Sequence, residues 1–171
     1  MRDKYEAAVY TVHAPRGSFD MKVDEYSDGV AALALETRSE CALFITACNP
    51  MGEKLSDKEN AVLFRKLLRE VSPIFGRSLV YQGVGQSADG TWKEPSVLVM
   101  HQEYPDWGYK LARKYKQIAF LWIPENRMPS LVMTDDAERE ARLTTHAYKV
   151  SRGYRGPVII PPPRSAKSNL A

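Results

Sequence analysis

The sequence predicts a single α+β domain, in which one central mixed β-sheet is flanked by helices, followed by a C-terminal helix and an extended basic tail. Two observations carry this prediction. Residues 41–48 and 118–123 are apolar at successive positions, which is typical of central strands covered on both faces. Residues 56–73 and 105–116 repeat apolar side chains at helical spacing and leave basic ones for solvent. A chain of 171 residues is long enough to bury one ordinary core.

The N-terminal segment predicts two strands and a short helix ahead of the first central strand. Residues 5–12 are rich in β-branched and aromatic side chains, and residues 19–23 alternate strictly between apolar and polar. Residues 27–36 have an alanine-rich centre, and Ser27 is placed to cap a helix. A helix is therefore favoured for this segment, with a third strand as the open alternative.

The first apolar run is predicted to be a strand that is buried on both faces. Cys41 and Cys48 are seven positions apart, so they point to opposite faces at roughly 23 Å along the strand. That geometry excludes a disulfide between them and favours a reducing, cytoplasmic setting. The two faces are Cys41, Leu43, Ile45 and Ala47 on one side and Ala42, Phe44 and Cys48 on the other.

Local signals divide the rest of the domain. Asn49-Pro50 ends the first central strand, because proline has no backbone donor, and Ser56 with Glu59 matches a capping box that begins a long helix. Pro95 is expected to prevent regular pairing, so residues 91–96 are predicted to form a bulge or an edge. The remaining expected elements are strands at 79–83 and 97–100, a turn at 87–90, a helix at 105–116, strands at 118–123 and 130–133, and a loop at 124–129.

The basic character of the chain belongs to its C-terminal part. Residues 1–137 hold 17 Lys and Arg against 19 Asp and Glu, whereas residues 138–171 hold 7 against 2. We therefore divide the chain into a globular domain at 1–134, a short charged helix at 135–150 and a mobile basic tail at 151–171. The charged N-terminus and the lack of a membrane-length apolar run predict no membrane segment.

Polar side chains follow the ends of the predicted strands, where open sheets tend to hold ligands. Amides and an aromatic ring suit a base, a nucleotide or an amino-acid-like ligand, and the positive end of the helix favours an anion. Helix capping by Ser56, turn formation by Asn49, and coverage of a sheet edge by Trp92 are the alternative explanations. The residues predicted to bind a ligand are Asn49, Ser56, Asn60, Gln82, Trp92, Glu94 and Gln117.

The sequence leans towards a protein that is not an enzyme. It contains no phosphate-loop, dinucleotide or zinc-ligand spacing, so neither a cofactor nor a metal is expected. Glu94 could act as a general base if burial raises its pKa. Cys48 could act as a nucleophile beside a histidine, but inert packing is the more common role of such a cysteine.

A series of short motifs occurs in order along the chain: Phe44-Ile45-Thr46-Ala47, Asn49-Pro50, Ser56, Glu59-Asn60, Gly83, Trp92, Glu94-x-Ser96 and Leu111-Ala112-x-x-Tyr115-x-Gln117-x-Ala119. Together they resemble the uncharacterised bacterial family called domain of unknown function 3293, over about residues 5–133. Cys48 stands where the family pattern has an aromatic residue, and Ile118 where it has asparagine. The family name implies no activity.

Two functional hypotheses follow from the sequence. The first is a polar pocket for a small nucleotide-like or amino-acid-like ligand. The alternative is a non-enzymatic interaction protein, an inhibitor or an accessory factor, which contacts a protein or nucleic-acid assembly through its basic tail. The residues predicted to make that contact are Arg152, Tyr154, Arg155 and Arg164.

Overall fold

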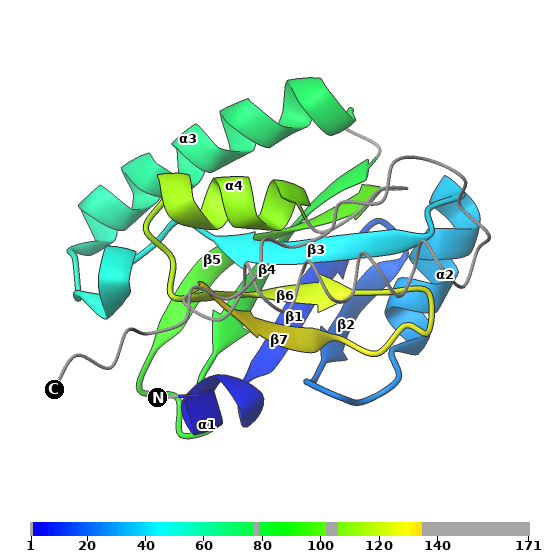
Figure 1. Ribbon diagram of the computed structural model, residues 1–171, viewed down its shortest axis with the longest axis horizontal. Helices are drawn as coiled ribbons and strands as arrows, with labels where there is room; N and C mark the ends of the chain where they lie inside the picture. The colour runs from blue at the N-terminus through cyan, green and yellow to red at the C-terminus, as the bar shows by residue number, and fades with distance from the viewer. Residues whose placement is uncertain (1, 77–78, 102–105, 135–171) are drawn as a thin grey trace, which may run out of the picture.

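The computed structural model describes residues 2–76, 79–101 and 106–134 (Figure 1). Its helices are α1 (Arg2–Glu6), α2 (Asp28–Thr37), α3 (Asp57–Phe75) and α4 (Asp106–Lys114), with a short 3-10 turn, η1 (Pro50–Gly52). Its strands are β1 (Val9–Ala14), β2 (Gly17–Met21), β3 (Cys41–Thr46), β4 (Val80–Gln86), β5 (Lys93–His101), β6 (Ala119–Ile123) and β7 (Ser130–Met133).

The strands form one seven-stranded sheet in the order β2-β1-β4-β5-β3-β6-β7. The predicted α+β class is confirmed. The expected mixed direction of the strands is wrong, because every pairing among the described strands is antiparallel. Short connections make β1–β2, β4–β5 and β6–β7 hairpins, whereas a parallel neighbour would need a crossover connection of a dozen or more residues.

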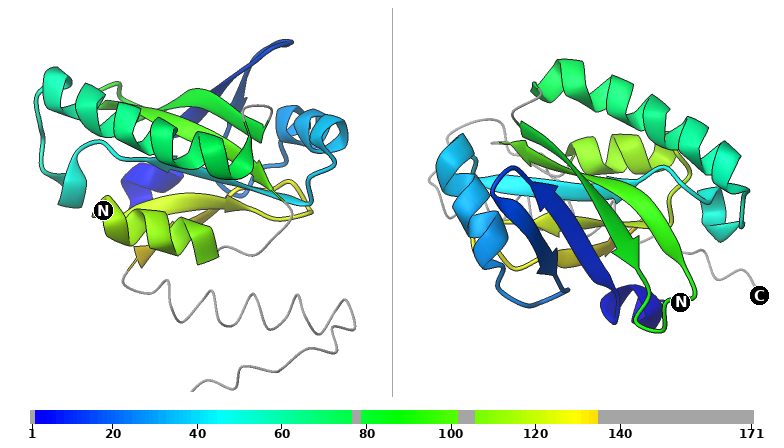
Figure 2. Two further views of the ribbon diagram at one scale, coloured as in Figure 1. Left: turned by 90° about the horizontal axis from the view of Figure 1, so that it is seen from above. Right: turned by 180° about the vertical axis from the view of Figure 1, so that it is seen from behind.

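Helices cover both faces of the sheet, as predicted (Figures 1 and 2). On one face α3 lies over β4 and β5, and α4 lies over β3 and β6. On the other face lie α1 and α2. The alternation of β3 matches this layering: Cys41, Leu43, Ile45 and Ala47 join the core under α3 and α4, while Ala42 and Phe44 join the core under α2.

The sheet curls towards the face that carries α1 and α2 (Figure 2). One buried cluster on this face combines side chains from the two ends of the sheet, such as Val12 of β1 and Leu131 of β7. Two backbone hydrogen bonds connect these ends: Asp24 donates to the carbonyl of Pro129 at 2.8 Å, and Ser27 donates to that of Arg127 at 3.0 Å. The curl therefore makes this face concave.

Of two segments near the N-terminus, the secondary structure of one differs from the prediction and that of the other agrees with it. Residues 2–6 form α1, where a strand was expected from Tyr5, and an Arg2–Glu6 ion pair at 2.7 Å supports this single turn. The helix predicted from Ser27 is confirmed, because the Ser27 hydroxyl accepts from the Val30 amide. The strand alternative for this segment is thereby excluded.

Strand β5 pairs regularly with β4 through Pro95, so the bulge expected there is wrong. The edge, the other expected form, is found on the side of β3, whose pairing with β5 ends at Ser96. The Pro95 carbonyl accepts from the Thr46 hydroxyl at 2.8 Å, so this carbonyl and the proline nitrogen face the side where β3 ends. Since Thr46 pairs with Ser96 as the last residue of β3, no partner strand requires a donor at Pro95. The missing N–H costs the sheet nothing at this position.

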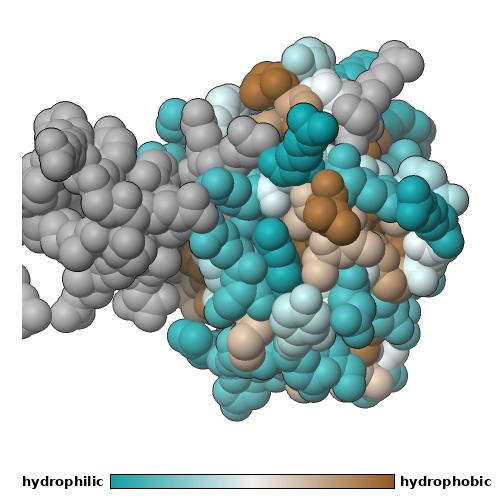
Figure 3. Space-filling model, turned by 90° about the vertical axis from the view of Figure 1, so that its right-hand side faces the viewer, coloured by the Kyte–Doolittle hydropathy of each residue, from teal (hydrophilic) through white to brown (hydrophobic). Residues whose placement is uncertain are grey.

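The surface at the end of the molecule formed by α2 is mostly hydrophilic, with small apolar spots among the hydrophilic side chains (Figure 3). Among the helices in the described ranges, none has the length and apolarity needed to cross a bilayer. The predicted charged helix at 135–150 and the basic tail at 151–171 lie outside the described residues.

Candidate functional site

Two asparagines hold the segment that leaves β3. Asn49 adopts a left-handed backbone conformation (φ 46°), which asparagine tolerates better than most residues. Its amide N–H donates to Asn60 Oδ1 at 2.9 Å, and Asn60 Nδ2 donates to Asn49 Oδ1 at 3.0 Å. The Leu55 amide donates to the same Asn49 oxygen at 2.9 Å. The first turn of α3 is thus bonded directly to the end of β3.

The side-chain nitrogen of Asn49 reaches Glu94 at the start of β5. Asn49 Nδ2 donates to Glu94 Oε1 at 2.6 Å. Burial raises the pKa of Glu94, and the hydrogen bond from Asn49 opposes part of that rise. Asn60, Asn49 and Glu94 therefore form one chain of hydrogen bonds across three segments that are distant in sequence.

Glu94 lies in the wall of an aromatic cleft on the concave face. The rings of Tyr5 and Trp92 are 6.0 Å apart, and Tyr10 meets Phe44 edge-on at 5.5 Å. The cavity volume that a water-sized group can occupy is about 30 Å³. The cleft is lined by Tyr5, Tyr10, Phe44, Ile45, Thr46, Gly85, Trp92, Glu94, Ser96, Ala119, Phe120, Leu121 and Leu131.

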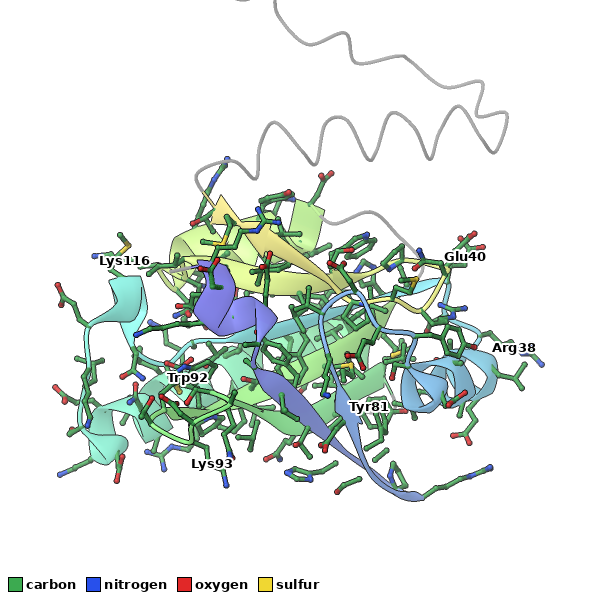
Figure 4. All side chains as sticks on the ribbon, turned by 90° about the horizontal axis from the view of Figure 1, so that it is seen from below. Arg38, Glu40, Tyr81, Trp92, Lys93 and Lys116 are labelled. Atoms are coloured by element: carbon green, nitrogen blue, oxygen red, sulfur yellow. The ribbon has the colours of Figure 1, made fainter. Side chains whose placement is uncertain are left out.

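A tight turn positions Trp92 at this cleft, beside α1 (Figure 4). The Trp92 amide donates to Ser87 Oγ at 3.1 Å. Asp89 accepts from the Ser87 hydroxyl at 2.7 Å and from the Thr91 amide at 3.0 Å, and these bonds lower the pKa of Asp89 to about 2. Gly90, with a φ of 71°, completes the turn that the sequence predicts.

Of the seven predicted ligand-binding residues, Trp92 and Glu94 line the cleft and five do not. Asn49 and Asn60 connect to it only through the hydrogen bond from Asn49 to Glu94. The other three have different roles. Ser56 and Glu59 form the predicted capping box of α3, which accounts for both side chains. Gln82 is exposed and pairs with Val97, so it lies on the face covered by α3. Gln117 is buried and donates to the carbonyls of Cys48 at 3.0 Å and Tyr115 at 3.1 Å, which ties α4 to the end of β3.

The two catalytic candidates differ in what their surroundings favour. Burial raises the pKa of the Cys48 thiol, and the nearby charge of Glu94 adds to this rise. A thiol held in its protonated form is a poor nucleophile, so the surroundings of Cys48 favour packing. Glu94 does have the buried surroundings that a general base requires. No group of three potential metal-binding side chains occurs within the described ranges.

Sequence reasoning missed four polar residues that line the cleft: Tyr5, Tyr10, Thr46 and Ser96. Tyr5 was placed in a strand, whereas it lies in α1. Tyr10 and Thr46 fit ordinary strand patterns, so no local signal separates them from packing residues. The one available signal was the Glu94-x-Ser96 spacing, because side chains two apart in a strand share a face.

The fold and the site define a small α+β domain with an aromatic, carboxylate-bearing cleft at the end of β3. The model of the family described as "Protein of unknown function (DUF3293)" matches residues 45–120. The resemblance predicted from the motifs is confirmed over this segment, which runs from the end of β3 to the start of β6 and includes Asn49, Asn60, Trp92 and Glu94. No curated protein and no solved structure matches the chain.

Replacing Asn60 with alanine is expected to destabilise the domain by about 2–3 kcal/mol. The change removes two hydrogen bonds to Asn49 and leaves the half-buried Asn49 amide without its acceptor, and a buried polar group left unsatisfied costs about 1–3 kcal/mol. Urea unfolding followed by circular dichroism measures the loss. Lys58→Ala, at an exposed position of the same helical turn, is the matched control and is expected to change stability by less than about 0.5 kcal/mol. Equal effects of the two variants would contradict the structural role of Asn60.

Proposed function

We propose that this domain binds a small amino-acid-like ligand in the cleft beside Glu94. The observation that carries the proposal is a half-buried carboxylate, held by Asn49, in a cleft whose walls are largely aromatic. Burying a carboxylate is costly unless something compensates its charge, and perturbed titratable groups in clefts are common at functional sites. A ligand that contacts Glu94 supplies that compensation.

Size favours an amino-acid-like ligand over a nucleotide-like one. The cleft has room for about 30 Å³ of water-sized groups, which corresponds to one or two waters. A single polar head group fits this space, whereas a purine would require Tyr5 and Trp92 to move apart. The alternative role as an interaction protein depends on Arg152, Tyr154, Arg155 and Arg164, which lie outside the described residues, and it stays a prediction.

A thermal-shift screen with amino acids, small amines and nucleosides tests the proposal. Compounds that bind the folded state raise its melting temperature by mass action, and a ligand at 100 times its Kd adds about 2.7 kcal/mol. We expect at least one amino-acid-like compound to stabilise the protein, and we expect Trp92→Ala to remove that effect by opening the wall of the cleft. Gln82→Ala, on the opposite face of the sheet, should leave it unchanged. Loss of the effect in Gln82→Ala with retention in Trp92→Ala would place the ligand elsewhere.

A further inference from the structure

We infer that the group recognised in the cleft is a primary ammonium, so that the ligand enters with a protonated amino end. This inference rests on the proposed function and adds the chemistry of recognition. Three features of the cleft support it independently: the charge of Glu94, the hydrogen-bonding capacity of the polar lining, and the size and aromatic character of the space.

The charge of the cleft favours a cation. Glu94 accepts one hydrogen bond from Asn49 at 2.6 Å, and an ionised carboxylate has capacity for about three more. Among the described residues, the charge of Glu94 raises the pKa of Tyr5 in α1, Tyr10 in β1 and Cys48 after β3. All three are neutral near pH 7, because the pKa of each is raised. An anionic head group would meet only repulsion from Glu94.

Three hydroxyls among the residues that line the cleft donate their protons to backbone carbonyls, whereas Tyr5 and Trp92 also carry donors. The Tyr10 hydroxyl donates its proton to the Tyr5 carbonyl at 2.7 Å. The Thr46 hydroxyl donates to the Pro95 carbonyl at 2.8 Å, and the Ser96 hydroxyl to the Glu94 carbonyl at 3.0 Å. A hydroxyl has one proton to donate, so each of these oxygens can offer a ligand only its lone pairs. An ammonium group, with three donors and no acceptor, complements these three hydroxyls.

The space and its walls select among cations. Aromatic rings attract cations within about 6 Å of their centroids, and Tyr5, Tyr10, Phe44 and Trp92 all line the cleft. A volume of about 30 Å³ for water-sized groups admits an ammonium, which is close to water in size. A quaternary ammonium and a guanidinium are both larger. The geometry therefore favours a primary amine over these bulkier cations.

The test compares three probes of related size: n-propylammonium chloride, 1-propanol and tetramethylammonium chloride. Binding is followed by NMR chemical-shift titration of the indole N–H signals at constant ionic strength, with Trp92→Phe to assign the Trp92 signal. We expect the Trp92 signal to shift with n-propylammonium and to respond at least tenfold more weakly to the other two probes.

Glu94→Gln keeps an oxygen that accepts from Asn49 but removes the charge, and it should weaken n-propylammonium binding by about 100-fold. Gln86→Glu, an exposed substitution on β4, controls for a general effect of charge.

Each outcome separates this inference from the proposed function. Equal responses to n-propylammonium and 1-propanol, or undiminished binding in Glu94→Gln, would overturn the ammonium assignment. In that case a neutral compound that stabilises the protein and loses its effect in Trp92→Ala would leave the cleft as the binding site. A second measurement guards against misfolding of the variant: unliganded Glu94→Gln should melt no lower than the parent, because it removes a carboxylate whose charged form is disfavoured by burial.

Discussion

Replacing Gly83 with alanine is expected to destabilise the domain by about 3 kcal/mol or more, because among the strand glycines Gly83 is the one where an added Cβ meets the closest atoms. Gly83 is paired with Val12 of β1 on one side and with Ser96 of β5 on the other. A Cβ at this position would clash with the backbone carbonyl oxygen of Thr11 and would lie 2.9 Å from the Phe44 ring. Overpacking of a core costs about 1–3 kcal/mol and sometimes more. We expect the upper end here, because the carbonyl cannot move without breaking the pairing of β1 with β4.

Chemical denaturation with urea measures this loss, and the neighbouring strand position provides its control. Gln82→Ala lies one residue away on the same strand, but its side chain is exposed, so a change below about 0.5 kcal/mol is expected. Gly83→Ala should also weaken ligand-induced stabilisation, because Phe44 and Tyr10 line the cleft. A Gly83→Ala variant as stable as Gln82→Ala would show that β1 and β4 are not packed as closely as described.

The parts of the fold that the sequence predicts well are those specified by adjacent residues. The Ser56–Glu59 capping box, the Ser27 cap and the two faces of β3 depend on spacings of one to three residues, and all are found. Strand direction depends instead on which strands become neighbours. No pattern among neighbouring residues in the sequence predicts that β3 lies between β5 and β6. The expected mixed sheet was therefore wrong. Tyr5 shows the same limit, because its β-favouring neighbours did not outweigh helix formation at 2–6.

The sequence predicts the site residues that lie at strand ends. It does not predict as well which face of the sheet a residue within a strand points to. Asn49 lies just after β3 and Glu94 lies at the start of β5, and the antiparallel pairing of these strands brings the two together. Gln82 belongs to the same end of the sheet but faces α3. A shift of one residue would have placed it on the concave face. Strand boundaries predicted from the sequence are not accurate enough to show on which face of the sheet such a side chain lies.

Acidification is expected to destabilise the protein through His101, by up to about 3 kcal/mol between pH 6.5 and pH 4. The His101 ring is buried between Phe75 at 5.6 Å and Trp122 at 5.7 Å, and burial lowers its pKa from 6.5 to about 4. In the unfolded chain the imidazole takes up its proton near pH 6.5, whereas the folded protein resists protonation until about pH 4. The unfolded state therefore binds more protons in this range, and stability falls as the pH falls. One pKa unit corresponds to about 1.4 kcal/mol, which sets the stated limit.

The contribution of His101 is isolated by comparing how steeply the free energy of unfolding changes with pH in the parent and in variants. Other groups titrate in the same range, and Glu94 acts in the opposite direction: its raised pKa means that its contribution to stability grows as the pH falls. His101→Phe keeps an aromatic ring beside Phe75 and Trp122 but cannot take up a proton, so its urea-derived stability should fall less steeply below pH 6.5 than that of the parent. Gln82→Ala, an exposed substitution that removes no titratable group, should follow the parent curve. Parallel curves for the parent and His101→Phe would mean that His101 takes up its proton equally readily in the folded and unfolded protein.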